Sequence, residues 1–116
     1  MAKDEGFGLG GAQTVLLALL RERARHAYDI AREVKLVSDN KLPFHYGTLY
    51  PTLYRMERDG LIVSVVEQPE GERMRRVYCL TEKGIAEADR VKQAWNDYAE
   101  AMDRIVNRGD QAAEGS

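Results

Sequence analysis

The sequence predicts a mainly α-helical fold with one small β-hairpin and a long C-terminal helix. Apolar residues recur every three or four positions in three stretches, 12–23, 27–37 and 46–59, as they do on the buried side of a helix. The β-branched run 61–67 and the segment 73–80, both read as strands, flank the turn-rich segment 68–72 and predict the hairpin. A 3.5-residue apolar repeat after residue 88 predicts the last helix.

Composition indicates one ordinary globular domain. The 116 residues are 44% hydrophobic and 31% charged, which is enough to build a core. The longest apolar run, Val15 to Leu20, is too short to cross a bilayer, and the first residues lack the pattern of a secretory signal. Because the single cysteine, Cys79, allows no internal disulfide, we expect a cytoplasmic protein.

The first helix is expected from about Leu9 or Ala12 to Arg23, after a glycine-rich segment, 1–11, that reads as a flexible arm. The expected buried stripe of this helix consists of Val15, Leu16, Leu19 and Leu20. Leu17 adds a second apolar side. A helix that is apolar on more than one side needs more than one cover. We therefore expect Val15 and Leu19 to contact a second subunit.

The second helix is expected over 27–37, after a break at Ala24-Arg25-His26. Its inward residues are predicted to be Ile30, Val34 and Val37. The segment 38–44 reads as a loop, since Pro43 disfavours helix at the residue before it.

The third helix is expected to begin near His45 or Tyr46 and to end at Asp59, with Leu49, Leu53 and Met56 facing the core. Its opposite face offers hydroxyls, a small residue and guanidinium groups, carried by Gly47, Thr48, Pro51, Tyr54, Arg55 and Arg58, with Tyr50 on the flank. This mixture suits a phosphate-lined groove, although an ordinary solvated face has the same spacing. Pro51 removes one N–H from the helix, so either the regular helix starts later or its first turn is distorted.

The predicted hairpin places Met74, Arg76, Tyr78 and Leu80 on one face of its second strand, and Arg73, Arg75, Val77 and Cys79 on the other. Three helices closed by a hairpin make a winged helix-turn-helix, in which the hairpin is the wing. We expect this domain to span 12–80.

The last helix, expected over 81–108, begins with Thr81 as a cap and Glu82 in its first turn. Its apolar residues follow spacings of four and three, at Val91, Trp95, Tyr98, Met102 and Ile105. About 25 residues make a helix of roughly 35–40 Å, longer than the small domain can cover. We therefore expect a homodimer formed through this helix, followed by a disordered tail over 109–116.

Two linked motifs stand out in the middle of the chain. The first is Gly47-Thr48-Leu49-Tyr50-Pro51, followed by Leu53, Arg55, Met56, Glu57 and Gly60-Leu61-Ile62; the second runs from Arg75 to Gly84. Together they resemble the PadR family of winged-helix transcriptional regulators. The resemblance covers most of residues 13–106 and matches the short type with a single C-terminal helix. It implies DNA-binding transcriptional control, usually repression, by a dimer that reads DNA with the start of its third helix.

On this reading, Thr48, Tyr54 and Arg55 reach base edges, while Tyr50 and Lys41 contact phosphates. Gly47 and Pro51 match the family motif at the same surface. His45 either bonds phosphate or caps the helix. Arg73 and Arg75 on the wing are candidate DNA contacts or a solvated strand face, and Arg76 is expected beside a local carboxylate.

Charge is compatible with DNA binding only by its distribution. The net charge is −2, yet residues 21–60 hold eight Arg or Lys against six Asp or Glu, whereas residues 81–116 hold five against eight. The middle of the chain is thus only modestly basic, which predicts weak non-specific affinity for DNA. A winged-helix module that binds protein and not DNA is the alternative.

Trp95 supports a second hypothesis. Trp95 resembles the tryptophan that stacks against planar drugs in multidrug-responsive repressors of the short PadR type. The resemblance implies that Trp95, with Val91 and Tyr98, is a candidate site for a planar aromatic effector. The alternative is that Trp95 simply packs the dimer. We expect no enzyme, no metal and no cofactor, because the sequence has no metal-ligand spacing, no phosphate loop and no histidine near Cys79 in sequence.

Overall fold

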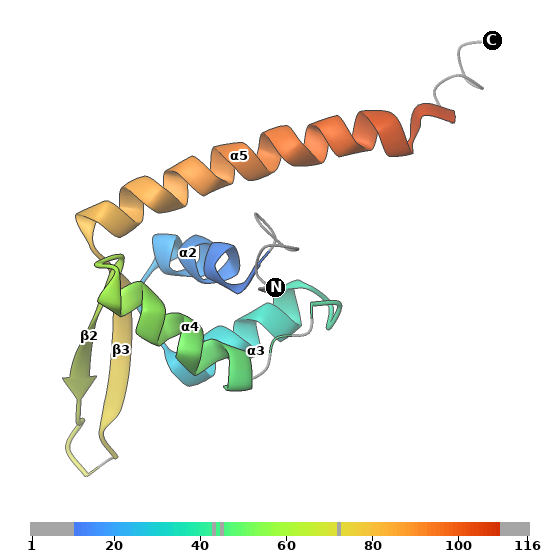
Figure 1. Ribbon diagram of the computed structural model, residues 1–116. Helices are drawn as coiled ribbons and strands as arrows, with labels where there is room; N and C mark the ends of the chain where they lie inside the picture. The colour runs from blue at the N-terminus through green and yellow to red at the C-terminus, as the bar shows by residue number, and fades with distance from the viewer. Residues whose placement is uncertain (1–10, 43, 45, 72, 110–116) are drawn as a thin grey trace.

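The computed structural model describes residues 11–42, 44, 46–71 and 73–109. These residues form the helices α2 (Ala12–Glu22), α3 (Ala27–Val37), α4 (Tyr46–Arg58) and α5 (Glu82–Val106), and the strands β1 (Arg25–His26), β2 (Ile62–Glu67) and β3 (Arg75–Leu80). The predicted winged helix with a long last helix is confirmed (Figure 1). Most of the predicted arm and tail lies outside the described residues.

The core lies where α2, α3, α4, the first half of α5 and the inner face of the sheet meet. Its fully buried members include Leu16, Leu17, Ile30, Leu49, Leu53, Met56 and Ile62. The inward face predicted for the third helix is therefore confirmed. On α2, however, Leu17 is fully buried while Val15 and Leu19 are half-buried. The reason is that α2 lies between α4 and α5 (Figure 1), so that both sides of the helix are covered.

One prediction for α3 is wrong. Ile30 and Val34 are buried as expected, but Val37 is 71% exposed. Val37 is the last residue of α3, and the chain turns there through Ser38, Asp39 and Asn40. The end of the helix projects past the elements that cover its first turns, so periodicity alone assigned Val37 to the core.

The sequence break at 24–26 contains a short strand that periodicity did not predict. Arg25 and His26 pair antiparallel with Tyr78 and Val77, which makes a three-stranded sheet of order β1-β3-β2. The side chain of Arg25 is only 2% exposed. Its Nε donates to the Leu19 carbonyl oxygen at 3.1 Å, and its Nη2 donates to a Glu22 carboxylate oxygen. These partners satisfy the charged group of a buried side chain.

The hairpin strands are shorter than predicted. β2 begins at Ile62 and β3 at Arg75, with Ile62 opposite Leu80 and Glu67 opposite Arg75. The turn between α4 and β2 passes through Gly60, whose φ of +78° favours glycine. Leu61 N then donates to the Met56 carbonyl oxygen at 2.9 Å, so the hairpin is joined closely to the end of α4.

Of the two alternatives that Pro51 left open, the later start of the third helix is not observed. α4 runs without interruption from Tyr46 to Arg58 and includes Pro51. The missing N–H deprives the Gly47 carbonyl of its usual helical donor. The following residue is anchored locally, because Thr52 Oγ1 donates to the Thr48 carbonyl oxygen at 2.7 Å.

The last helix begins as predicted. Thr81 is the N-cap, and its hydroxyl accepts from Gly84 N at 3.0 Å, while Glu82 lies in the first turn. α5 crosses α2 and then projects beyond the winged-helix unit (Figure 1). Its first half is thus packed on the domain, and its second half is not.

Candidate nucleic-acid interface

The outward side of α4 has the composition that the sequence predicted. Gly47, Thr48, Pro51 and Tyr54 are exposed, and Tyr54 is 70% exposed. Tyr50 is also exposed, on the flank of this group. Hydroxyl groups, an aromatic ring and a glycine are therefore presented together along one side of a helix.

Arg55 is less outward than its spacing suggests. The side chain is half-buried, and its Nη2 lies 3.4 Å from Thr52 Oγ1. Thr52 is 1% exposed and is not among the predicted site residues. Its position three residues before Arg55 is the signal that sequence reasoning missed, because residues at this spacing are neighbours on a helix.

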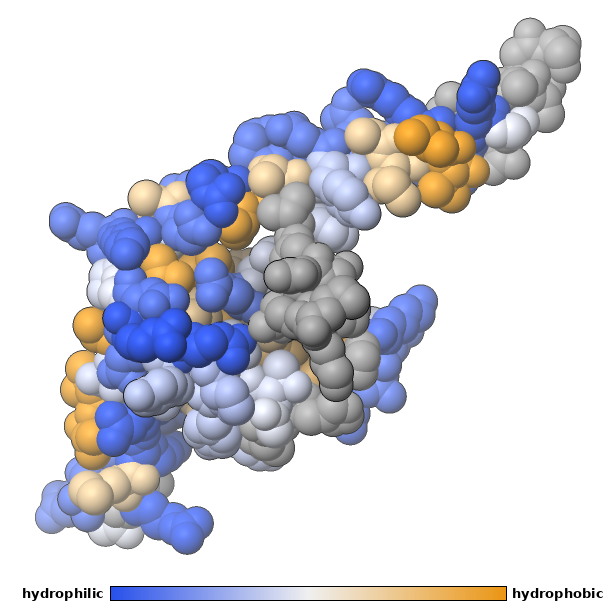
Figure 2. Space-filling model, in the orientation of Figure 1, coloured by the Kyte–Doolittle hydropathy of each residue, from blue (hydrophilic) through white to orange (hydrophobic). Residues whose placement is uncertain are grey.

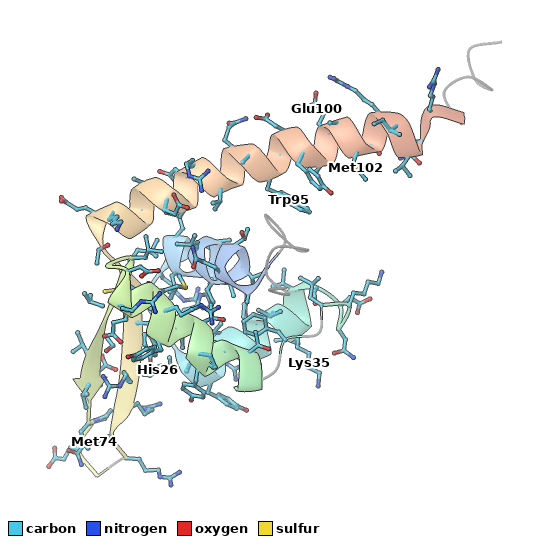
Figure 3. The ribbon with its side chains drawn as sticks, viewed as in Figure 1. His26, Lys35, Met74, Trp95, Glu100 and Met102 are labelled. Carbon is cyan, nitrogen blue, oxygen red and sulfur yellow. The ribbon has the colours of Figure 1, made fainter. Side chains whose placement is uncertain are left out.

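The hairpin carries the other predicted contacts. Arg73 and Arg75 are exposed, and together with Gly71 and Met74 they line an open hollow of about 610 Å³ near the hairpin tip. Figure 3 places Met74 at the end of the hairpin farthest from α5. The hairpin end and α4 both lie on the side of α2 that faces away from α5 (Figure 1).

A polar cluster lies between α4 and the hairpin. Ser64 Oγ donates to Glu57 Oε2, and Arg76 Nη1 donates to Ser64 Oγ, each at 3.0 Å. Arg76 is thus linked to a carboxylate through a hydroxyl. The nearby Tyr78 is buried, and burial raises the pKa of its hydroxyl, an effect that Glu57 increases and Arg76 opposes.

The remaining predicted DNA contacts are not brought onto α4. Lys41 is exposed in the loop after α3, where its backbone N donates to the Ser38 carbonyl oxygen at 3.1 Å. His45 lies outside the described residues. The structure therefore assembles one group of candidates on α4 and a second on the hairpin, with Lys41 on a separate loop.

An apolar groove lies between α2, α3 and α5, with a volume of about 520 Å³. It is lined by Thr14, Val15, Ala18, Leu19, Val34, Val37, Ser38, Leu42 and Trp95. Trp95 and Tyr98 are both exposed, and their ring centroids are 5.9 Å apart. Val91, in contrast, is 6% exposed within the core of the domain. Of the three predicted effector residues, only Trp95 lines the groove.

The projecting half of α5 leaves apolar side chains uncovered. We call Trp95, Tyr98, Met102 and Ile105 the α5 stripe; all four are exposed in the single chain. Figure 2 shows hydrophobic surface along this part of the helix. In Figure 3, Trp95 and Met102 project from one side of α5, whereas Glu100 projects from the other. Val91 continues the same spacing inward, into the chain's own core.

Neither a metal-binding cluster nor a membrane-spanning helix is found among the described residues. No group of three or more histidine, cysteine, aspartate or glutamate residues is arranged to hold a metal ion there. Among the same residues, no helix has both the length and the apolar character needed to span a membrane.

Comparison with known proteins agrees with the fold and the sequence motifs. Residues 16–90 match the model of the transcriptional regulator PadR-like family. The chain is 37% identical over 81 residues to the transcriptional regulator Rv3488 of Mycobacterium tuberculosis, which covers 70% of this chain and 62% of that protein.

Solved structures share the architecture. A transcriptional regulator from Clostridium thermocellum superposes with a TM-score of 0.73 at 23% identity, covering 91% of this chain and 98% of that one. A PadR family transcription regulator from Clostridium difficile gives a TM-score of 0.69 at 26% identity, covering 81% and 96%. Proteins of this kind are in general not enzymes. The chain belongs to the PadR-like family of transcriptional regulators.

Proposed function

We propose that this regulator is a homodimer that binds specific DNA sequences and represses transcription until a small-molecule effector releases it. The observation that carries the proposal is the exposed side of α4, where Gly47, Thr48, Pro51 and Tyr54 stand opposite a fully buried apolar face. A helix fits the major groove of B-DNA, which is about 12 Å wide.

In this proposal α4 reads base edges through Thr48, Tyr54 and Arg55. Tyr50 and Lys41 contact phosphates, as does His45 if it does not cap the helix. The hairpin adds Arg73 and Arg75, whose exposed guanidinium groups suit the backbone or the minor groove. The polar residues on α4 supply sequence preference, and the arginines on the hairpin supply affinity that does not depend on sequence.

Dimerisation is supported by the α5 stripe, which runs from Trp95, beside the groove, along the part of the helix that projects from the domain (Figure 1). Apolar side chains at a 3.5-residue spacing pack best against another helix. A two-fold axis through two such helices also covers Val15 and Leu19 on α2 and presents two copies of α4. Two half-sites about 34 Å apart on the DNA then match the two helices.

The effector is proposed to enter the apolar groove beside Trp95. The groove volume of about 520 Å³ falls within the range of small-molecule sites, and its lining is almost wholly apolar, with Thr14 and Ser38 as polar members. An indole at its edge suits a planar aromatic compound. A ligand there would contact α2, α3 and α5 together. Its binding would therefore change the orientation of the two subunits relative to each other.

Planar aromatic compounds are expected to quench the fluorescence of Trp95, the only tryptophan, and to weaken DNA binding over the same concentration range. Ala18→Phe, which adds bulk to the groove without a second indole, is the matched control and should abolish the quenching without unfolding the protein, as judged by circular dichroism. If a panel of such compounds leaves the fluorescence of the unmodified protein unchanged, the effector site is not here.

Selection of bound duplexes from random-sequence DNA tests the function itself. A specific regulator should enrich a palindromic site, and its affinity should fall steeply between low and moderate salt, as counterions return to the phosphates. The alternative, a winged-helix module that binds protein, predicts no enriched sequence and little dependence of its binding on salt.

Replacing Arg55 with alanine is expected to weaken binding to the selected duplex by about 1–3 kcal/mol and to relax the base preference at one position, as the loss of a base contact does. Arg104→Ala, on the exposed side of α5 and paired with Glu100, is the control and should bind normally. Fluorescence anisotropy measures both. An unaltered affinity for Arg55→Ala would show that Arg55 reads no base.

A further inference from the structure

The hydroxyl of Ser64 joins three separate elements. It donates to Glu57 Oε2 and accepts from Arg76 Nη1, both at 3.0 Å. Glu57 lies in the last turn of α4, Ser64 is the third residue of β2, and Arg76 is the second residue of β3. A hydroxyl has one proton to donate and two lone pairs that accept, so a single side chain can link the helix to both strands of the hairpin.

The hairpin is firmly held at its base. Thr81 N donates to the Leu61 carbonyl oxygen at 3.0 Å, and Leu61 N donates to the Met56 carbonyl oxygen at 2.9 Å. From this base the strands continue past the Ser64–Tyr78 pair to the Glu67–Arg75 pair, beyond which Arg73 lies. The arginines proposed to contact DNA therefore lie at the outer end of the hairpin, far from its fixed base.

The outer part of the hairpin has little burial to fix its angle. Val65 and Val66, which follow Ser64 on β2, are both exposed. β1 pairs with β3 at Tyr78 and Val77, and His26 Nε2 lies 3.4 Å from Glu67 Oε1, but these contacts join the hairpin to β1 and not to α4. The Ser64 hydroxyl, in contrast, acts directly between the hairpin and α4.

Because the hairpin is long, a small displacement at Ser64 produces a larger displacement at the hairpin tip. At about 3.4 Å per residue, Ser64 lies roughly 10 Å from Leu61 and the hairpin tip nearly three times as far. A shift of about 1 Å at Ser64 therefore becomes 2–3 Å at the tip, which exceeds the roughly 0.5 Å range of good hydrogen-bond lengths.

We propose that Ser64 is a positioning residue, which sets the angle between the hairpin and α4 so that Arg73 and Arg75 meet the same duplex that α4 reads. The proposal rests on the proposed DNA-binding function, but the angle itself is a property of the free protein. Both can be measured separately.

The test compares Ser64→Ala, which lacks the hydroxyl, with Ser64→Thr, which keeps it and suits a strand. The probe is the best duplex selected from random-sequence DNA. Ser64→Ala is expected to bind it about 3- to 10-fold more weakly, because misplaced arginines would lose one or two hydrogen bonds to the duplex. Ser64→Thr is expected to restore binding. Arg73→Ala should cost less in the Ser64→Ala background than in the unmodified protein. Melting temperatures should agree within a few degrees, since Ser64 is not in the core.

A second measurement uses the free protein. Nitrogen-15 relaxation should show greater motion of the amides of residues 65–67 and 75–77 in Ser64→Ala than in Ser64→Thr. Equal motion in both variants, or additive effects of Ser64→Ala and Arg73→Ala on binding, would overturn the positioning role. If the unmodified protein enriches no duplex, the proposed function fails, and the relaxation data alone then decide whether Ser64 fixes the hairpin.

Discussion

Replacing Gly84 with alanine is expected to lower the free energy of unfolding by about 3 kcal/mol or more, a large effect for one methyl group. A Cβ at this position would overlap the Leu61 carbonyl oxygen and lie 3.0 Å from the Leu61 carbonyl carbon and 3.1 Å from Leu80 Cδ2. The gain in helix propensity from Gly to Ala, about 1 kcal/mol, is too small to offset this overlap.

The overlap cannot be relieved by a side-chain movement, because the atom in the way belongs to the backbone. The Leu61 carbonyl oxygen accepts a hydrogen bond from Thr81 N at 3.0 Å, and the Gly60 carbonyl oxygen accepts one from the Thr81 hydroxyl at 2.6 Å. Lys83 Nζ also donates to the Asp59 carbonyl oxygen at 2.8 Å. The start of α5 is thus bonded to the turn that joins α4 to the hairpin.

Thermal and denaturant unfolding measure the effect, and a fall in melting temperature of about 10 °C or more is expected. Gly109→Ala is the matched control, because among the described residues no atom beyond its chain neighbours lies within 4 Å of the position of its Cβ; it should unfold like the unmodified protein. A Gly84→Ala variant as stable as the unmodified chain would mean that α5 does not approach Leu61 this closely.

Several features of the fold could be predicted from the sequence because each has a local physical signal. The Leu49, Leu53 and Met56 spacing identified the buried side of α4, and Thr81 followed by Glu82 identified the start of α5. The hairpin followed from the β-branched run 61–67 and a second strand-like segment, 73–80, around a turn. The family motifs predicted how these elements are arranged into a winged helix, which periodicity alone does not predict.

Other features depend on contacts between distant residues, and periodicity could not show them. The strand at Arg25 and His26 exists because β3 lies beside it, since two residues have no periodicity of their own. Leu17 is fully buried because α5 covers a second side of α2, and Val37 is exposed because the end of α3 projects past the described elements that cover its first turns. Thr52 beneath Arg55 and Ser64 between Glu57 and Arg76 are polar residues whose importance appears only when their partners are placed.

Replacing Met102 with aspartate is expected to weaken the proposed dimer at least 100-fold, because a carboxylate would have to be buried in an apolar contact between helices. Met102 belongs to the α5 stripe and is exposed in the single chain, so the change should not unfold the domain. Trp95 is a less suitable target, since it also lines the groove of its own chain, and its replacement would combine two effects.

Asn96→Asp provides the matched control. Asn96 is exposed and its helical position is on the side of α5 away from the stripe, so this variant adds the same charge without burying it. Sedimentation velocity should show a monomer for Met102→Asp and a dimer for Asn96→Asp at the same micromolar concentration. Binding to a palindromic duplex should weaken only for Met102→Asp, because two half-sites then no longer act together. A Met102→Asp protein that sediments as a dimer would place the subunit contact elsewhere and leave the exposure of the α5 stripe to be explained by another partner.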